Sequence, residues 1–223
     1  MAAQIVSKQR VTEHGEVLTG AREVNEMLDL VKNETERIDS RFLEPACGNG
    51  NFLAAILDRK LCVVEARYAK SQLEYERNAV LAVCSIYGID KLEDNIFACR
   101  ARLFAIFDRN YTNRFKSSAK EECRDAVRYV LERNIIHGDA LSLKTVGPIE
   151  QPIIFSEWSA PFHNSLLKRR DFTFSELLDE GGSKQRNLFL TDEYSDLGKR
   201  AFIPKELTSF PPIHFLKVRD HDN

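Results

Sequence analysis

Residues 42–53 form the part of this chain best able to do chemistry, with the sequence Phe-Leu-Glu-Pro-Ala-Cys-Gly-Asn-Gly-Asn-Phe-Leu. An apolar pair runs into Glu44 and Pro45, two glycines follow, and a new apolar run begins, which predicts a buried strand followed at once by a helix. Gly48 and Gly50 have no Cβ, so the backbone can approach a ligand closely there. The carboxylate of Glu44 favours a cationic amine or hydroxyl groups and would repel a phosphate.

Other glycine loops fit this segment less well. A dinucleotide-binding loop needs a third glycine where Leu53 stands. A phosphate-binding P-loop ends in Gly-Lys-Ser/Thr, but Asn51 and Phe52 follow Gly50. An ordinary tight turn remains the alternative to a ligand-binding loop.

Two further acidic residues are predicted at strand ends. A second strand is expected over Ala82–Ile89, ending at Asp90, and a third over Asn134–His137, ending just before Asp139. Ligands of parallel α/β sheets bind beyond the carboxyl ends of the strands, where Glu44 also lies. Asp90 offers two acceptor oxygens, which suit a pair of ribose hydroxyls. Asp139 is suited to accept from an exocyclic amine, although either aspartate alone could be a helix cap or turn residue.

The elements that must position these residues alternate between strands and helices. Further segments predicted from hydrophobic periodicity are helices over Ala21–Val31, Asn51–Leu57, Asn95–Phe107 and Glu121–Leu131, strands over Arg41–Leu43 and Pro152–Phe155, and a charged, helix-prone insertion over residues 58–80. This order predicts an α/β fold with a parallel sheet and right-handed crossovers. We expect a lead-in over residues 1–20, a core over 21–160 and a C-terminal extension over 161–223 that completes the sheet or contacts a partner.

The composition excludes several classes of protein. The chain has 223 residues, a net charge of −2 and five cysteines without a C-x-x-C pair. The charge gives no global basic footprint, so contact with nucleic acid must be local or shared with a partner. The cysteines argue against a disulfide framework or a zinc site and for a reducing, cytoplasmic location. No metal-ligand spacing, signal peptide or membrane span is found in the sequence.

With these motifs in place, the chain resembles the N6-adenine DNA methyltransferases of restriction–modification systems over roughly residues 11–156. Residues 43–53 are similar to the D/E-P-A-C-G-S/T-G motif of that family. Residues 10–20 resemble its N-terminal cofactor motif, which usually ends Phe-Thr-Pro, with Thr19 at the threonine. Residues 87–90 resemble its ribose-binding strand end, and residues 137–141 the loop that reads the cofactor adenine.

The resemblance implies a Rossmann-like class I methyltransferase fold with a mainly parallel sheet, and the short C-terminal part raises the question of whether that sheet is complete. It implies S-adenosylmethionine as the cofactor. The residues expected to hold it are Thr19, Glu44, Pro45, Ala46, Cys47, Gly48, Asn49, Gly50, Asp90, Lys91, Asp139 and Ala140.

The resemblance breaks at the catalytic motif. Family members end the fourth strand with Asn/Asp-Pro-Pro-Tyr/Phe, whereas here Phe155 leads into Ser-Glu-Trp-Ser at residues 156–159. Trp158 is the candidate to stack on a flipped base. The alternative is that Trp158 packs into the domain, since tryptophan is highly buried on average. No catalytic residue is therefore assigned.

Two functions stay open. The first is site-specific, adenine-specific DNA methylation by a modification subunit, with DNA recognised through a separate specificity or partner subunit. The second is a catalytically inactive methyltransferase-like subunit with a structural or cofactor-binding role. Methylation of a small molecule or RNA is a third reading. The basic run at residues 168–170 is either a phosphate contact or a solvated helix face.

Overall fold

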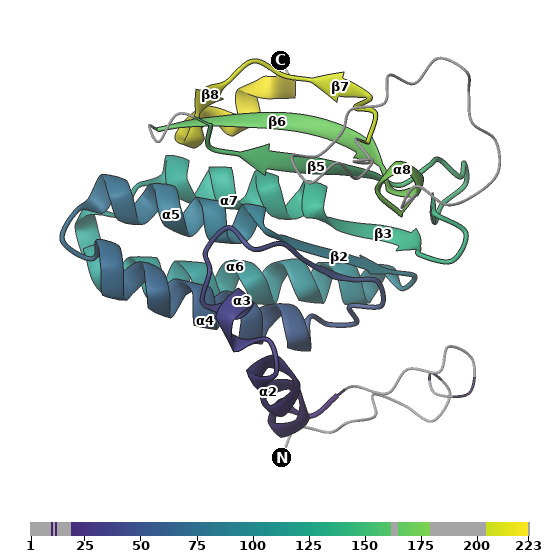
Figure 1. Ribbon diagram of the computed structural model, residues 1–223, viewed down its shortest axis with the longest axis horizontal. Helices are drawn as coiled ribbons and strands as arrows, with labels where there is room; N and C mark the ends of the chain where they lie inside the picture. The colour runs from purple at the N-terminus through teal and green to yellow at the C-terminus, as the bar shows by residue number, and fades with distance from the viewer. Residues whose placement is uncertain (1–9, 11, 13–18, 162–164, 179–203, 223) are drawn as a thin grey trace, which may run out of the picture.

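The computed structural model describes residues 10, 12, 19–161, 165–178 and 204–222 (Figure 1). Most of the predicted N-terminal cofactor motif, residues 11 and 13–18, lies outside this part of the chain. The described chain begins with two short helices, α2 (Ala21–Asp29) and α3 (Lys32–Thr35). They lead into the first strand.

A first sheet forms the centre of the molecule. Strands β1 (Phe42–Glu44), β2 (Ile86–Asp90) and β3 (Ile135–Asp139) are parallel and lie in the order β1-β2-β3. A short strand, β4 (Lys144–Thr145), pairs antiparallel with β3. The predicted α/β class is confirmed, and this sheet is mainly parallel.

Helical hairpins connect the parallel strands. Helices α4 (Asn51–Tyr68) and α5 (Gln72–Cys84) join β1 to β2, and helices α6 (Glu93–Phe115) and α7 (Glu121–Asn134) join β2 to β3. The 23 residues of α6 span about 34 Å at about 1.5 Å per residue. The five residues of β2 span only about 16 Å. The helices therefore run well past the amino ends of the strands and pack on one another there (Figure 1).

The helical character predicted for residues 58–80 is confirmed, since they form most of the α4–α5 hairpin that supports the sheet. The predicted start of the second strand is wrong. The second strand was expected to start at Ala82, but residues 82–84 end α5 and the strand starts at Ile86. The buried apolar run from Ala79 to Ile89 suits a buried helix as well as a buried strand, so periodicity alone does not place the change.

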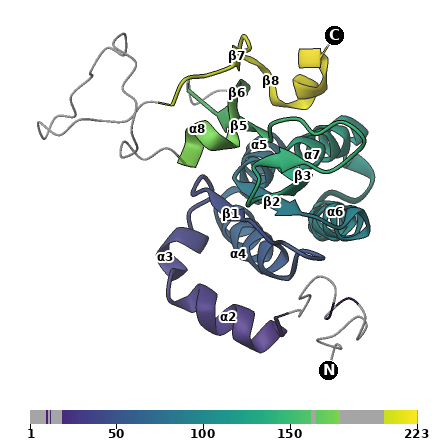
Figure 2. The ribbon, with the colours of Figure 1, turned by 90° about the vertical axis from the view of Figure 1, so that its right-hand side faces the viewer.

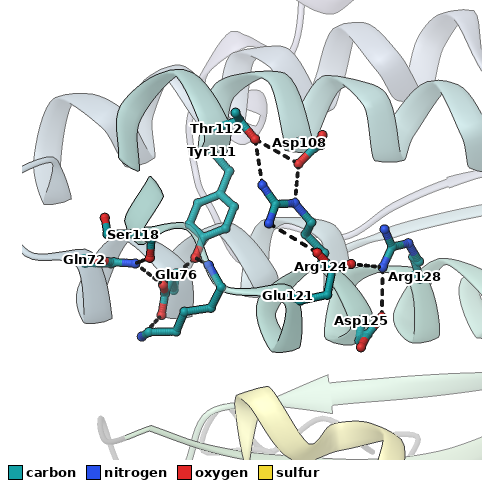
Figure 3. Close-up of polar contacts among 11 residues, drawn as sticks. Gln72, Glu76, Asp108, Tyr111, Thr112, Ser118, Glu121, Arg124, Asp125 and Arg128 are labelled. Carbon is teal, nitrogen blue, oxygen red and sulfur yellow. Dashed lines mark hydrogen bonds and ion pairs between the residues drawn. The ribbon is translucent and has the colours of Figure 1, made fainter. Parts of the chain in front are cut away.

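The helical half has an aromatic core with one buried acid. Tyr75, Phe107 and Tyr111 are fully buried, and the ring of Tyr111 stacks on the rings of the other two. Beside them Glu76 is 0% exposed and joins α5 to α6 and to the start of α7 (Figure 3). Burial first, and then the hydrogen bond to Glu76, raise the pKa of Tyr111.

A second sheet packs on one face of the first. Strand β5 (Ile154–Ser159) pairs antiparallel with β6 (Leu166–Thr173), which also pairs with β7 (Thr208–Ser209) and β8 (Ile213–His214). Helix α8 (Phe174–Leu178) and the 3-10 helix η2 (Phe215–Asp222) complete this layer. Tyr87 and Phe155 meet edge to face across the two sheets, with ring centroids 5.4 Å apart. Helices α4 and α6 lie on the opposite side of β2 (Figure 2).

Strand β5 was predicted as the fourth parallel strand, and this is wrong. Ile153, just before β5, packs against Gly138 near the carboxyl end of β3. If Gly138 carried a Cβ, that atom would lie only 2.7 Å from Ile153 Cδ1. At the other end, Trp158 Nε1 donates to Asn134 Oδ1 at 3.1 Å, just before β3 begins. Strand β5 therefore runs opposite to β2 and β3, and within the described residues it joins only the second sheet. Its apolar run identifies a strand, but its partner is β6, which the sequence did not single out.

We expect a pH effect from Lys60, which is 0% exposed at the amino end of the sheet. Its Nζ donates to Ile38 O at 3.0 Å and to Ser85 Oγ at 2.7 Å, and burial lowers the pKa of Lys60 to about 7. An unfolded lysine keeps its proton up to a pKa of about 10.4, so between pH 7 and 10 the unfolded chain binds more protons. Stability should rise with pH in that window, by up to about 1.4 kcal/mol per unit. Urea titrations across this pH range give the free energy of unfolding of the wild type and of Lys60→Met. If that free energy has the same dependence on pH in both proteins, the effect is contradicted.

Candidate functional site

The predicted glycine loop connects β1 to α4 at the carboxyl edge of the first sheet. Gly48 and Gly50 both adopt left-handed backbone conformations, with φ of 51° and 84°, which glycine adopts without strain. Cys47 N donates to Ile89 O at 2.9 Å, so the loop is fastened to the end of β2. Gly50 also packs closely: a Cβ there would lie 2.7 Å from Cys99 Sγ on α6. Both glycines are therefore required by the local backbone, and Pro45 and Ala46 are exposed at the turn.

Asp90 joins the end of β2 to this loop. Its Oδ2 accepts from Gly48 N at 2.8 Å, and its Oδ1 accepts from Leu92 N at 2.9 Å and from Asn95 Nδ2 at 3.2 Å. A carboxylate has about four acceptor positions, so about one remains, on Oδ2. Asp90 can accept one ribose hydroxyl as it stands. For both oxygens of Asp90 to accept from ribose hydroxyls, the Asn95 amide must first leave Asp90 Oδ1.

Asp139 lies beside Lys91 at the next strand end. Lys91 Nζ is 2.9 Å from Asp139 Oδ2, and Leu141 N donates to Oδ1 at 2.9 Å. The hydrogen bond from Lys91 is the main reason that the pKa of Asp139 is lowered. Asp139 is thus held ionised, and an exocyclic amine would have to compete with Lys91. Ala140 follows Asp139 and is half-buried.

Glu44 lies on the helix side of β1, in a less polar setting. Burial raises the pKa of Glu44, and a hydrogen bond from the Ala46 amide opposes that rise. The thiol of Cys47 is close by, and its pKa is raised by its contact with Cys99, by burial and by the charges of Asp90 and Glu44. Two carboxylates therefore act on one side chain of the loop. Such a site favours a ligand with a positive charge.

Both described ends of the N-terminal motif contact this edge. Asn51 Nδ2, in the first turn of α4, donates to Thr19 O at 2.9 Å. Arg10 forms an ion pair with Asp94 and donates to Asn95 Oδ1 at 3.2 Å. The structure thus brings Thr19 to the glycine loop and Arg10 to the neighbours of Asp90.

Helix α6 supplies neighbours of the loop that sequence reasoning missed. Asn95 holds Asp90, Cys99 contacts Gly50 and Cys47, and Arg102 Nη1 lies 3.3 Å from Asn49 Oδ1. The spacing from Asn95 to Cys99 to Arg102 places them on one helix face. That spacing is present in the sequence, but it does not show that this face of the helix packs against the glycine loop.

Trp158 does not lie at this site, and its prediction as a base-stacking residue is wrong for this conformation. The side chain is 3% exposed, and Tyr129 packs against the indole with ring centroids 6.2 Å apart. Because β5 runs away from the carboxyl edge, Trp158 lies near the amino end of β3. The alternative, packing into the domain, is what the structure has.

The basic run at residues 168–170 is neither a helix face nor a continuous patch. It belongs to β6, where successive side chains point to opposite faces. Arg169 is buried and pairs with Asp171 at 2.6 Å, while Arg170 Nε donates to Glu157 at 2.8 Å. A shared phosphate contact by this run is therefore not supported.

Comparisons with known proteins give no match to this chain, whether with family models, curated proteins or solved structures. Within the described ranges, no helix combines the length and hydropathy of a membrane span. Nor does this part of the chain hold a group of three or more His, Cys, Asp or Glu side chains placed to bind a metal ion.

Proposed function

We propose that this chain binds S-adenosylmethionine at the carboxyl edge of its first sheet, as a methyltransferase-like protein with a Rossmann-like core. The observation that carries the proposal is the hydrogen bond from Gly48 N to Asp90 Oδ2, at 2.8 Å. It joins a left-handed glycine loop to an acid at the neighbouring strand end. A nucleoside ligand needs both features at this place in an α/β sheet.

Each acid has a role in the proposal. Asp90 accepts a ribose hydroxyl, and Asp139 accepts from the exocyclic amine of the adenine after Lys91 is displaced. The negative charges of Glu44 and Asp90 beside Cys47 favour the sulfonium and the amino group of the cofactor. Gly48, which has no Cβ, lets the methionine part approach the backbone of the loop that it forms with Asn49 and Gly50.

The proposed reaction is transfer of the methyl group from the cofactor to N6 of adenine in DNA, within a cytoplasmic restriction–modification system. The bond from sulfur to the methyl carbon breaks as the bond from nitrogen to that carbon forms, and the amine loses a proton. A partner subunit would recognise the DNA, since this chain has a net charge of −2. No residue of this chain is assigned to receive the proton.

The second candidate function is cofactor binding without catalysis. The direction of β5 favours it, because residues 156–159 run away from the carboxyl edge and Trp158 is buried. Methyl transfer from labelled cofactor to mixed-sequence DNA, with and without proteins from neighbouring genes, separates the two. Incorporation in either condition supports the enzyme, and its absence in both, with cofactor bound, supports the inactive subunit.

We expect Asp90→Ala to weaken S-adenosylmethionine binding at least about tenfold, because it removes a charged hydrogen-bond acceptor and releases the glycine loop. Isothermal titration calorimetry measures this directly. The matched control is Asp125→Ala on α7, whose side chain is 44% exposed and far along the chain from the loop. Equal affinity in wild type and Asp90→Ala would refute the assignment of the site, and so would absence of binding to the folded wild type.

A further inference from the structure

The outer edge of β1 is open. Strand β1 pairs with β2 and with no other strand of the described chain. Phe42 N donates to Ser85 O at 2.9 Å, so Phe42 directs its backbone toward β2. Successive residues of a strand alternate, so the N–H and C=O of Leu43 point away from β2. An edge of this kind is a template for pairing with another strand.

Two hollows flank this edge on opposite faces of the sheet. Phe42 is in register with Ile86 and faces α4, whereas Leu43 is in register with Tyr87 and faces the second sheet. The helix-side hollow has a volume of about 200 Å³ and is lined by Met27, Val31, Phe42, Glu44 and Phe52, among others. The sheet-side hollow has a volume of about 290 Å³ and is lined by Leu43, Tyr87, Phe155, Phe172 and Leu177, among others.

Apolar side chains at the rims of both hollows are exposed. On the helix side Met27 is 54% and Val31 is 44% exposed, and on the sheet side Leu177 is 41% exposed. Leu43, between the hollows, is 41% exposed. In Figure 2, β1 is the outermost strand of its sheet, with α2, α3 and α4 on one side and α8 and β5 on the other. The apolar surface thus continues around the open strand.

The lining of the sheet-side hollow also includes two arginines, Arg41 and Arg170, and one glutamate, Glu157. Glu157 accepts from Arg170 Nε at 2.8 Å and lies 2.6 Å from Arg41 Nη2. Arg170 also lies 3.8 Å from Glu206, whereas Arg41 shares Glu157 with Arg170. The Arg41 side chain is 51% exposed. An acidic side chain next to Arg41 would complete this pairing.

We propose that an extended segment of a partner protein adds to the first sheet beside β1. Only an extended segment can bond to the outward backbone of Leu43 and fill hollows on both faces, because its successive side chains alternate. The segment must be apolar on both faces, as a buried strand of a parallel sheet is, with an acidic residue near Arg41. This goes beyond the cofactor site and needs neither cofactor nor catalysis.

The test uses the whole chain and a labelled peptide, acetyl-Lys-Glu-Val-Ile-Val-Ile-Val-Thr-Lys-amide, followed by fluorescence polarisation. Val31→Asp and Leu177→Asp should each weaken binding at least tenfold, since each places a charge in one hollow. Ile149→Asp is the control, because Ile149 is 74% exposed and lines neither hollow. Bound peptide should also slow hydrogen exchange of the Leu43 amide.

Several results would overturn the proposal. One is absence of binding up to the solubility limit of the peptide, and another is equal binding by a peptide N-methylated at every Val and Ile. A third is indifference to both Asp variants. Slow exchange of the Leu43 amide without peptide, in a monomer or a dimer by sedimentation, would mean that the chain itself covers the edge. Calorimetry with S-adenosylmethionine in the absence of peptide tests the cofactor site separately, so either proposal can fail alone.

Discussion

Replacing Glu76 with alanine should lower the free energy of unfolding by about 2 to 5 kcal/mol, the range for opening a cavity at a fully buried side chain. Glu76 is 0% exposed and accepts from Tyr111 Oη at 2.5 Å, from Gln72 Nε2 at 2.8 Å and from Lys120 Nζ at 2.8 Å (Figure 3). These contacts join α5, α6 and the residue that precedes α7. The alanine variant leaves a cavity and removes the acceptor of a buried hydroxyl. Urea denaturation followed by circular dichroism measures the loss as a lower midpoint.

The control variant replaces Glu121, an acidic residue of the same network. Glu121 contacts Arg124 and Arg128, but its side chain is 61% exposed (Figure 3). Water competes for these ion pairs, so Glu121→Ala should change stability by less than about 1 kcal/mol. Glu76→Gln keeps most of the volume and an acceptor for Tyr111, and should fall between the two. Similar small losses in Glu76→Ala and Glu121→Ala would show that burial does not set the strength of this network.

The sequence predicts the glycine loop and the carboxyl edge of the first sheet well because local rules determine them. The glycine loop, the strand before it and the helix after it are adjacent in the chain, and backbone conformation selects glycine at residues 48 and 50. The parallel order of β1, β2 and β3 then follows from the alternation of strands and helices, and it brings Glu44, Asp90 and Asp139 to one edge.

The second sheet was not predictable in the same way. Its pairing depends on β6, which carries Lys168 and Arg170 on one face and reads as a polar run rather than a strand. Arg169 is buried through its bonds with Asp171, on the same face of β6, and with Tyr129, which lies 40 residues away in the chain and which no periodicity identifies as a partner. The direction of β5 likewise depends on contacts between distant parts of the chain, such as that of Trp158 with Asn134. The same limit applies to Asn95 and Cys99, whose roles depend on how α6 packs against the loop.

Replacing Gly50 with alanine should lower the free energy of unfolding by about 2 to 5 kcal/mol, for two separate reasons. A left-handed φ of 84° costs a residue with a Cβ roughly 1 to 2 kcal/mol. The new Cβ would also lie 2.7 Å from Cys99 Sγ in a packed interior, and such overpacking costs about 1 to 3 kcal/mol. Gly147→Ala is the control, because no atom lies within 4 Å of a Cβ at that position. It should change stability by less than about 0.5 kcal/mol.

A double-mutant cycle with Cys99→Ala separates the two reasons. Cys99 is 0% exposed, so its replacement alone destabilises the fold by removing buried contacts. In the Gly50→Ala background the same replacement removes the clashing sulfur and leaves Cys99 Cβ at 3.4 Å, an ordinary contact. The double variant should therefore be more stable than the sum of the single losses predicts, by about 1 kcal/mol or more. Strict additivity would show that strain at φ alone selects glycine, and that close packing of the loop against α6 does not.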